Sequence, residues 1–409
     1  QGVVTKFYVA WGGHDMAENI VLLVLARAAG TPEGVKGISL FVVPKFVVNA
    51  EGSLGARNDV HCVSIEHKLG IKASPTAVLQ FGDHGGATGF LVGEENRGLE
   101  YMFIMMNAAR FGVGVQGIAI AERAYQKAVA FAKDRVQSRP VDGSQPAAAA
   151  IIHHPDVKRM LMTMRSYVEG CRAMATVAAA AYDTAHHHPD AETAKQNQAF
   201  YEFLVPLIKG YSTEMSQEVT SLGVQVHGGM GFIEETGAAQ YYRDAKILTI
   251  YEGTTAIQAN DLVGRKTARD GGQTAKALAA QIEATEGELT QRGDADALAM
   301  AKRLKAAREA FLDVVTFVAA NTRSKPNAVF SGSVPYLMLA GNLVAGWQLG
   351  RSLMLAQDQM AAGVDVAFMK AKITTARFYA DHHLTKVPGV RDAIIDGADS
   401  VTELALESF

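Results

Sequence analysis

The chain has 409 residues, of which 48% are hydrophobic and 20% are charged, so it is long enough for two or three domains with sizeable cores. Its net charge of -3 argues against the basic surface that nucleic-acid binding needs. The two cysteines, Cys62 and Cys171, have no metal or redox spacing, and we find neither a membrane-span pattern nor a secretory signal. These features predict a reduced, cytoplasmic protein.

The first part of the chain, residues 1–95, is predicted to form closely spaced β-strands. Short β-rich runs alternate with clusters of Gly, Pro, Asn and Asp, and they lie at 3–9, 20–26, 37–43, 60–65 and 76–81. Because no helical pattern separates these runs, we expect an antiparallel sheet or a small barrel. The chain begins at Gln1 with a strand already in progress, so we expect an N-terminal part to be missing.

From about Tyr101 the apolar residues recur at helical spacing. We predict long helices at about 101–133, 157–174 and 200–222, and further helical patterns at about 275–322, 334–357 and 364–385. The last three follow a polar, glycine-containing joint at 266–272 and should form a helical bundle. We expect this tail to pack on the preceding helices or on a symmetry mate, with a core that includes Phe311, Val315, Trp347, Leu353, Phe368 and Phe378.

Two dense motifs carry the chemical information. Glu252 is the carboxylate that directly precedes Gly253 in the motif at 241–258, after an apolar run that should bury the segment. Burial favours the neutral form of a carboxyl group and makes its ionised form a stronger base. The earlier motif at 225–232 is rich in glycine, which lets backbone amides approach a phosphate, although glycine also ends ordinary helices.

In this order, the two motifs resemble the end of the acyl-CoA dehydrogenase family, flavoproteins that desaturate acyl-CoA thioesters. The resemblance covers roughly 1–265 and includes further short matches at 6–13, 37–44, 68–76, 93–99, 107–110 and 117–123. It implies an α+β fold without the family's N-terminal helical domain. The expected parts are an antiparallel middle β-domain at 1–95, a four-helix C-terminal domain at 96–265 and an additional helical domain at 273–409. The tail is similar to the subgroup that includes 3-methylmercaptopropionyl-CoA dehydrogenase-like proteins.

The resemblance implies that Glu252 is the catalytic base, which removes the α-proton of the thioester while the β-hydride moves to flavin. The backbone N–H of Glu252 would donate to the thioester oxygen, with Gly253 beside the substrate. A helix cap or a surface ion pair is the alternative interpretation of Glu252. Arg110 matches a position that contacts the CoA portion, and its alternative is an ion pair inside a helix interface.

The resemblance also implies FAD as the cofactor. The family reaches the adenosine-diphosphate part of FAD across a subunit interface. Ala10 lacks the hydroxyl that the family places near the flavin ring, and Arg139 could share the role of Arg135. His154 aligns with a FAD-contact region. The implied cofactor-binding residues are Tyr8, Val9, Ala10, Arg135, Gln225, Val226, His227, Gly228, Gly229 and Thr254.

The implied activity is FAD-dependent conversion of an acyl-CoA thioester to the trans-2-enoyl-CoA, within fatty acid metabolism. A homodimer or homotetramer would pass the electrons to an electron-transfer flavoprotein. Two alternatives stay open, an acyl-CoA oxidase-like flavoenzyme and a non-catalytic truncated module. No metal site is expected, because three consecutive histidines at 186–188 cannot all face one ion and are predicted to lie in a solvated loop.

Overall fold

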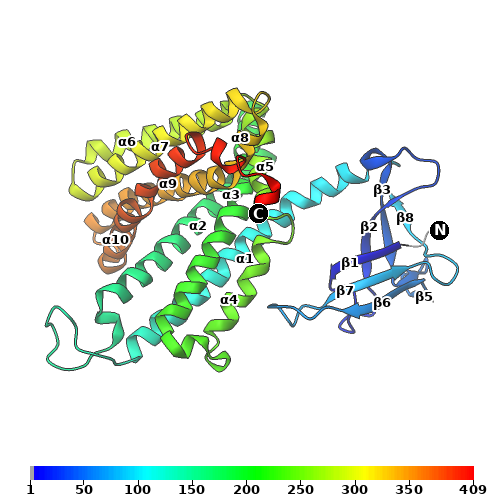
Figure 1. Cartoon of the computed structure of the whole chain (residues 1–409), viewed down its shortest axis with the longest axis horizontal. Helices are drawn as coiled ribbons and strands as arrows, with labels where there is room; N and C mark the ends of the chain where they lie inside the picture. Colours follow the sequence, from blue (N-terminus) through cyan, green and yellow to red (C-terminus); the bar gives the residue numbers. More distant parts are fainter. Residues whose placement is uncertain (1–3) are drawn as a thin grey trace. The chain divides into compact units, whose positions relative to one another are not determined.

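The computed structural model describes residues 4–409, with side chains from Val9 onward (Figure 1). The chain divides into two compact units, Gln1–Ala109 and Arg110–Phe409. The first unit is built of strands and the second of helices, which confirms the α+β fold class. Helix α1 (Gly98–Asp134) begins in the first unit and continues in the second.

The described strands of the first unit form three small antiparallel sheets, with the orders β1-β7-β6, β2-β3-β8 and β4-β5. The antiparallel arrangement confirms the expectation from the close spacing of the strands. Three strands had no sequence signal, because β4, β5 and β8 have only three or four residues each. The strands are β1 (Val4–Ala10), β2 (Val21–Arg27), β3 (Ile38–Pro44), β4 (Phe46–Val48), β5 (Leu54–Arg57), β6 (Val60–Ile65), β7 (Thr76–Phe81) and β8 (Phe90–Val92).

Side chains from two of these sheets form the core of the first unit. Val24 and Val43 come from the sheet of β2 and β3, and Ala77, Leu79 and Phe81 come from the central strand β7 of the other sheet. Successive side chains of a strand point to opposite faces, so Ala77, Leu79 and Phe81 share one face of β7. The two sheets are therefore joined by their apolar faces.

The second unit is built of helices, apart from its connections, the longest of which runs over 135–150. Figure 1 shows α2 beside α3 and α6 beside α7, and both pairs are in contact along the chain. Its α-helices after α1 are α2 (Pro155–His187), α3 (Ala191–His227), α4 (Ala238–Lys246), α5 (Thr255–Asp261), α6 (Gln273–Arg292), α7 (Ala295–Asn321), α8 (Pro326–Ser331), α9 (Ser333–Ala361), α10 (Val366–His382) and α11 (Val387–Ile395).

One continuous hydrophobic core joins the middle helices to the tail. Buried side chains from α1, α2 and α3 pack in the same cluster as those from α7, α9 and α10. The expectation that the tail packs on the preceding helices is therefore confirmed. Its expected core residues Phe311, Trp347 and Leu353 are buried, but Phe368 is 48% exposed. Phe368 was wrongly placed in the core because it lies in the first turn of α10, where its ring packs against Lys372.

The single helical pattern expected at 275–322 is two helices. Gly293, with φ 73°, ends α6 in the left-handed region, where glycine has no steric penalty. Asp294 then caps α7 by accepting hydrogen bonds from the amides of Asp296 and Ala297. The apolar periodicity continues across this break, so periodicity alone did not reveal it.

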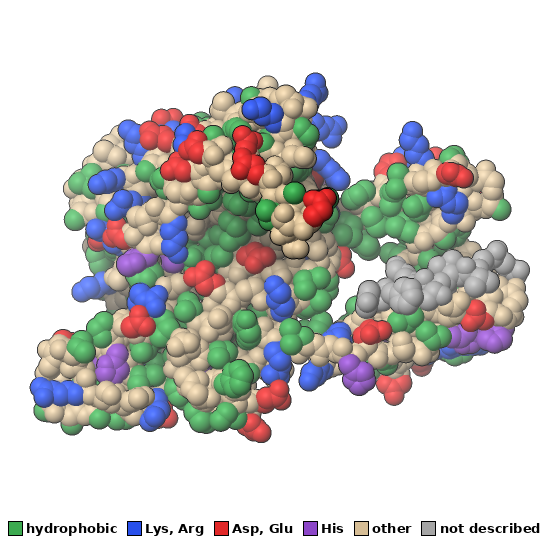
Figure 2. Space-filling view, viewed as in Figure 1, with side chains coloured by type: hydrophobic (Ala, Val, Ile, Leu, Met, Phe, Trp, Pro, Cys, Tyr) green, Lys and Arg blue, Asp and Glu red, His purple; other side chains and the backbone are tan. Residues whose placement is uncertain are grey.

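Helix α1 is long and apolar enough to cross a membrane by length and composition alone, with a mean hydropathy of 1.3 in its most apolar stretch. A core helix of a soluble protein passes the same test. In the second unit, α1 contributes Ile118, Ala121, Ala124, Ala128 and Ala132 to the shared core. On the face seen in Figure 2, acidic and basic side chains are interspersed over the second unit and form no large basic patch.

Candidate active site and cofactor cavity

Glu252 lies in a tight turn between η5 (Ile247–Thr249) and α5. Its backbone has φ 54°, and Gly253 follows with φ 92°, so two consecutive residues adopt the left-handed region. A non-glycine residue rarely adopts this conformation unless the surrounding structure holds it there. Thr254 caps α5 by accepting a hydrogen bond from the amide of Ile257 at 3.3 Å. The turn is thus fixed on its C-terminal side by the start of a helix.

The sequence analysis expected a buried segment around Glu252, and this expectation is wrong for the residue itself. The side chain of Glu252 is exposed, although Leu248 and Thr249 just before it are buried. The burial already ends at Ile250, which is 49% exposed, and Glu252 follows in the exposed turn. The apolar run predicted the burial of η5 correctly, but it carried no information about the turn that follows.

Lys209 of α3 forms hydrogen bonds to the backbone on both sides of Glu252. Its side chain is fully buried, and its Nζ donates to the backbone oxygens of Leu248 at 2.9 Å and Gly253 at 2.5 Å. Burial and, to a smaller extent, the charge of Arg110 lower the pKa of Lys209, and the carboxylates Glu214 and Glu252 partly oppose them, so that the pKa is about 8. One ammonium group therefore ties both ends of the Glu252 turn to α3.

Close packing beneath the turn makes a side chain at position 253 unfavourable. A Cβ on Gly253 would lie 2.7 Å from Nε2 of Gln258, and its positive φ would add backbone strain. Gln258 is fully buried, so its amide has little room to move. Thr255 is also buried, and its hydroxyl donates to Oε1 of Glu214 at 2.5 Å. The first turn of α5 and α3 together form a rigid support for Glu252.

Arg110 is 5% exposed and forms an ion pair with Asp261, with 3.3 Å between Nη1 and Oδ2. Burial lowers the pKa of the Arg110 guanidinium, while the charge of Asp261 raises it. The geometry thus contains the ion pair inside a helix interface that the sequence analysis gave as the alternative for this residue. The Nε atom of Arg110 is buried and has no hydrogen-bond partner within the described residues.

The glycine-rich motif forms one wall of a cavity of about 660 Å³ in the second unit. Gly228 ends α3 with φ 59°, and the chain continues into η3 (Gly228–Phe232). No atom lies within 4 Å of the Cβ position of either Gly228 or Gly229, so the space beside this backbone is open. The motif therefore ends a helix and lines a cavity at once. The predicted residues that line this cavity are Gln225, Val226, His227, Gly228, Gly229, Arg135 and His154.

Two residues of the cavity wall are held by their own contacts. His227 is buried, its Nδ1 lies 2.7 Å from the Gly223 oxygen, and its ring stacks on Phe131 at 4.4 Å. Burial lowers the pKa of His227, which favours the neutral ring. His154 has its Nε2 2.7 Å from the Gln137 oxygen. These contacts fix the shape of the wall and leave its backbone as the main source of donors.

Arg135 and Arg139 differ in position. Arg135 lines the cavity and donates through Nη1 to the Val136 oxygen at 2.8 Å. Arg139 instead donates through Nε to the Gln145 oxygen at 3.1 Å, within its own loop, and it does not line the cavity. The geometry thus favours Arg135 over Arg139 as a ligand of an anionic group.

The remaining candidate residues belong to the first unit. Val9 and Ala10 lie in β1, where they pair with Ala77 and Thr76 of β7, and Ala10 is exposed. The side chain of Tyr8 lies outside the described residues. The histidines at 186–188 were expected in a loop, but α2 extends through His187 because its last turn continues regular helical geometry.

Comparison with known proteins places these features in a family. The model "Acyl-CoA dehydrogenase, C-terminal domain" matches residues 96–266, and "Acetyl-CoA dehydrogenase C-terminal like" matches 276–405. The chain is 55% identical over 402 residues to 3-methylmercaptopropionyl-CoA dehydrogenase of Ruegeria pomeroyi, which covers 98% of this chain and 68% of that protein. It is 37% identical over 428 residues to the broad-specificity linear acyl-CoA dehydrogenase FadE5 of Mycobacterium tuberculosis. This match covers 99% of this chain and 69% of that protein.

Solved structures with the same fold include an acyl-CoA dehydrogenase from Bacillus anthracis complexed with FAD, with a TM-score of 0.75 and 19% identity, covering 97% of this chain and 64% of that one. ACDH-11 of Caenorhabditis elegans in complex with C11-CoA has a TM-score of 0.74 and 20% identity. The match covers 96% of this chain and 62% of that one. The chain thus spans 62% to 69% of the length of these four proteins. The family models and the 55% identical relative lead to one conclusion: the chain belongs to the acyl-CoA dehydrogenase family of oxidoreductases.

Proposed function

We propose that the protein binds FAD and dehydrogenates an acyl-CoA thioester between its α and β carbons, with Glu252 as the base. The observation that carries the proposal is the turn at Glu252, where an exposed carboxylate stands on a left-handed backbone held by Lys209 and Thr254. A structural carboxylate has no need of such support. A base that must meet one particular proton does, because rate depends steeply on its position.

The residues of the second unit fit the adenosine-diphosphate part of FAD. The cavity of about 660 Å³ lies within the usual size of a cofactor site, roughly 300–1,000 Å³. The open backbone at Gly228 and Gly229 and the guanidinium of Arg135 offer donors of the kind that bind a pyrophosphate. Thr254, Val9 and Ala10 are proposed as further FAD contacts on the basis of the family resemblance. FAD, when bound, supplies the acceptor for the β-hydride.

The chain's own part in the reaction is proton transfer and substrate positioning. The Glu252 carboxylate takes the α-proton, and its backbone N–H donates to the thioester oxygen, which gains negative charge as the proton leaves. Gly253 is proposed to lie beside the substrate, and its lack of a side chain lets Gln258 pack beneath the turn. Arg110 is proposed to contact the CoA portion on the basis of the family resemblance. An electron-transfer flavoprotein as acceptor and a cytoplasmic location stay predictions.

The direct test is anaerobic addition of acyl-CoA to the natural protein with FAD bound. The first compound to test is 3-methylmercaptopropionyl-CoA, because the 55% identical relative is named as a dehydrogenase of this thioester. Bleaching of the flavin absorbance and formation of the enoyl-CoA are expected. A colourless protein that cannot be reconstituted with FAD would instead indicate a non-catalytic module. Rapid reoxidation by O₂ without another acceptor would indicate an oxidase.

Replacing Arg135 by glutamine is expected to weaken FAD binding by about 10- to 100-fold, because one charge-assisted hydrogen bond to the pyrophosphate is lost. Arg139→Gln is the matched control, since Arg139 bonds only within its own loop in the described structure. Flavin content after dialysis and fluorescence titration of the apoprotein measure the effect. Equal losses in the two variants would contradict a specific role for Arg135.

We further propose a homodimer or homotetramer in which flavin binding and assembly are coupled. Apolar side chains stand exposed beside the cavity wall, among them Met230, Ile233 and Phe232, which is 87% exposed. Exposed clusters of this kind commonly mark subunit contacts. Removing FAD is expected to lower the melting temperature and to promote dissociation, because a ligand that binds at an assembled site stabilises the assembly. A stable flavin-bound monomer in light scattering would contradict this.

A further inference from the structure

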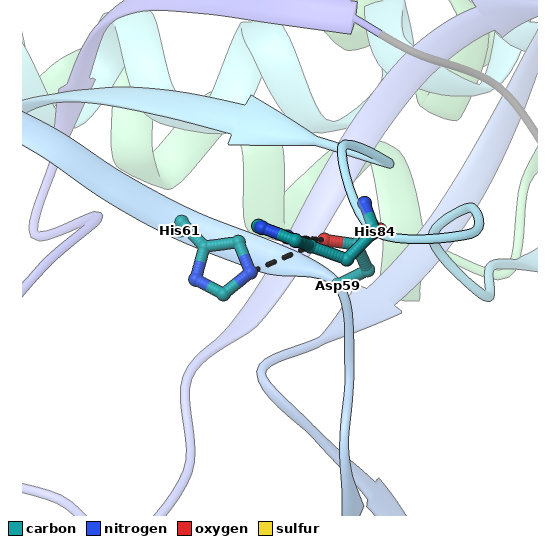
Figure 3. A group of neighbouring side chains, drawn as sticks. All are labelled: Asp59, His61 and His84. Carbon is teal, nitrogen blue, oxygen red and sulfur yellow. Dashed lines mark hydrogen bonds and ion pairs between the residues drawn. The ribbon is translucent and has the colours of Figure 1, made fainter.

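Asp59, His61 and His84 form a compact cluster on the surface of the first unit, within which one ligand atom from each residue lies within 4.8 Å of the others. Figure 3 shows both imidazoles turned toward the Asp59 carboxylate. The cluster plays no part in the proposed reaction. Asp59 and His61 are neighbours in sequence, and His84 joins them because β6 pairs with β7 and the turn after β7 returns to the start of β6.

The distances within the cluster suit one small cation. Oδ1 of Asp59 lies 3.1 Å from Nε2 of His61 and 3.3 Å from Nδ1 of His84. Zinc binds imidazole nitrogen and carboxylate oxygen at about 2.0–2.2 Å, so two ligand atoms of a tetrahedral site are about 3.3–3.5 Å apart. The two separations from Asp59 Oδ1 therefore already approach those around an ion, and the two ring nitrogens lie within 4.8 Å of each other.

The carboxylate is fixed in its orientation by the backbone. Oδ2 of Asp59 accepts hydrogen bonds from the amides of His84 at 2.6 Å and Gly86 at 3.2 Å, which leaves Oδ1 facing the two rings. Desolvation alone would raise the pKa of Asp59, but these hydrogen bonds and those with the imidazoles outweigh it and lower the pKa. A ligating carboxylate held by outer hydrogen bonds is a common feature of metal sites.

We propose that Asp59, His61 and His84 bind one divalent transition-metal ion of the zinc class. Two imidazole nitrogens and one carboxylate oxygen suit zinc, whereas magnesium and calcium prefer sites built from oxygen ligands alone. Three protein ligands leave a fourth position for water. Both rings are accessible, with His61 at 40% and His84 at 75% side-chain exposure, so the ion can enter from solvent. Histidine side chains also appear on the visible surface of the first unit in Figure 2.

The bound ion would fasten the turn after β7 to the start of β6. Each imidazole would bind the ion through one ring nitrogen that carries no hydrogen. Because the ion binds the folded form, it is expected to raise the melting temperature of the chain in proportion to the logarithm of its concentration above Kd.

The test is calorimetric titration of chelator-treated protein with zinc chloride, together with the visible absorption of the cobalt(II) form. We expect one site with Kd below about 10 µM, intense four-coordinate cobalt bands, and no competition from excess magnesium. His61→Ala and His84→Ala should each weaken the site by more than about 100-fold, since even an outer-shell partner is worth about 10- to 100-fold. Asp59→Asn keeps the shape of the side chain and should also lose the site.

Two controls separate this site from other histidines. His67→Ala changes an exposed histidine of the same unit that lies outside the cluster and should leave zinc binding unchanged. A double His186→Ala/His188→Ala variant removes histidines at the end of α2 and should also retain the site. Circular dichroism checks that each variant is folded. The proposal is overturned by the absence of a stoichiometric site, or by a site that survives the loss of His61 and His84.

Discussion

Replacing Glu252 by glutamine is expected to reduce the rate of flavin reduction by about 10²- to 10⁴-fold, the usual loss when a positioned general base is removed. Glutamine keeps the shape of the side chain but has no basic oxygen at neutral pH. The turn should keep its conformation, because Lys209 and Thr254 hold it through the backbone and not through the Glu252 carboxylate. FAD and acyl-CoA should therefore still bind.

The measurement is stopped-flow bleaching of the flavin under anaerobic conditions, at equal flavin content. Glu235→Gln is the matched control, because Glu235 is an exposed carboxylate in η4 (Glu234–Thr236), outside the turn. This control should react at the parent rate. Bleaching of Glu252→Gln within tenfold of the parent rate would falsify the assignment of Glu252 as the base.

Replacing Lys209 by methionine is expected to lower kcat by about 10²-fold while KM changes little. Methionine fills similar space, but the oxygens of Leu248 and Gly253 lose their shared donor. The left-handed backbone of Glu252 would then be free to relax, and a displacement of about 1 Å can cost about 10²-fold in rate. Lys209 does not touch the substrate in this proposal, so its role is to position the base.

Lys266→Met is the control for loss of a partly buried lysine. Lys266 pairs with Glu202 at 2.8 Å and makes no described contact with the Glu252 turn. Its replacement should alter stability without changing kcat. If both lysine variants kept the parent kcat, or if Lys209→Met only lowered flavin content, the positioning role of Lys209 would be wrong.

The low pKa of Lys209 also predicts a pH dependence of stability. The folded pKa is about 8, below the usual lysine value of about 10.4, so the unfolded chain binds more protons between these two values. The contribution of Lys209 to the free energy of unfolding therefore rises with pH across this window and is constant below it. Denaturant unfolding at several pH values should show this slope in the difference between the parent protein and Lys209→Met, because the other titrating groups contribute to both.

Much of the fold could be predicted from local patterns. Strands β6 and β7 begin and end where the sequence analysis placed them, because their β-rich runs are bounded by polar and turn-forming residues. The break at Gly293 and the exposure of Phe368 were not predicted, since both depend on how a helix ends or begins in three dimensions. The continuous core between middle helices and tail likewise depends on contacts distant in sequence.

In the candidate site, too, residues in local motifs were predicted, and residues that depend on distant contacts were not. Glu252 and the glycine-rich segment at 225–229 were found because each belongs to a dense local motif. Lys209 was missed, although a lysine within the apolar run of 203–211 is a usable signal, because only a buried partner can satisfy its charge. The cluster of Asp59, His61 and His84 was not predicted, because only the pairing of β6 with β7 brings His84 to the other two residues.

Because the hydrophobic core is continuous, residues 273–409 help to support the turn at Glu252. Helix α9 contacts α5 and α3, and a Cβ on Gly210, next to Lys209, would lie 2.7 Å from Cδ1 of Leu337. Tyr336 of α9 also bonds through its hydroxyl to Thr267 at 3.0 Å. Residues 273–409 therefore cannot be exchanged for the tail of a relative without effects on the rest of the second unit. A chimera that receives the tail of a relative would have to inherit the matching surfaces of α3 and α5, so these segments are expected to evolve in concert.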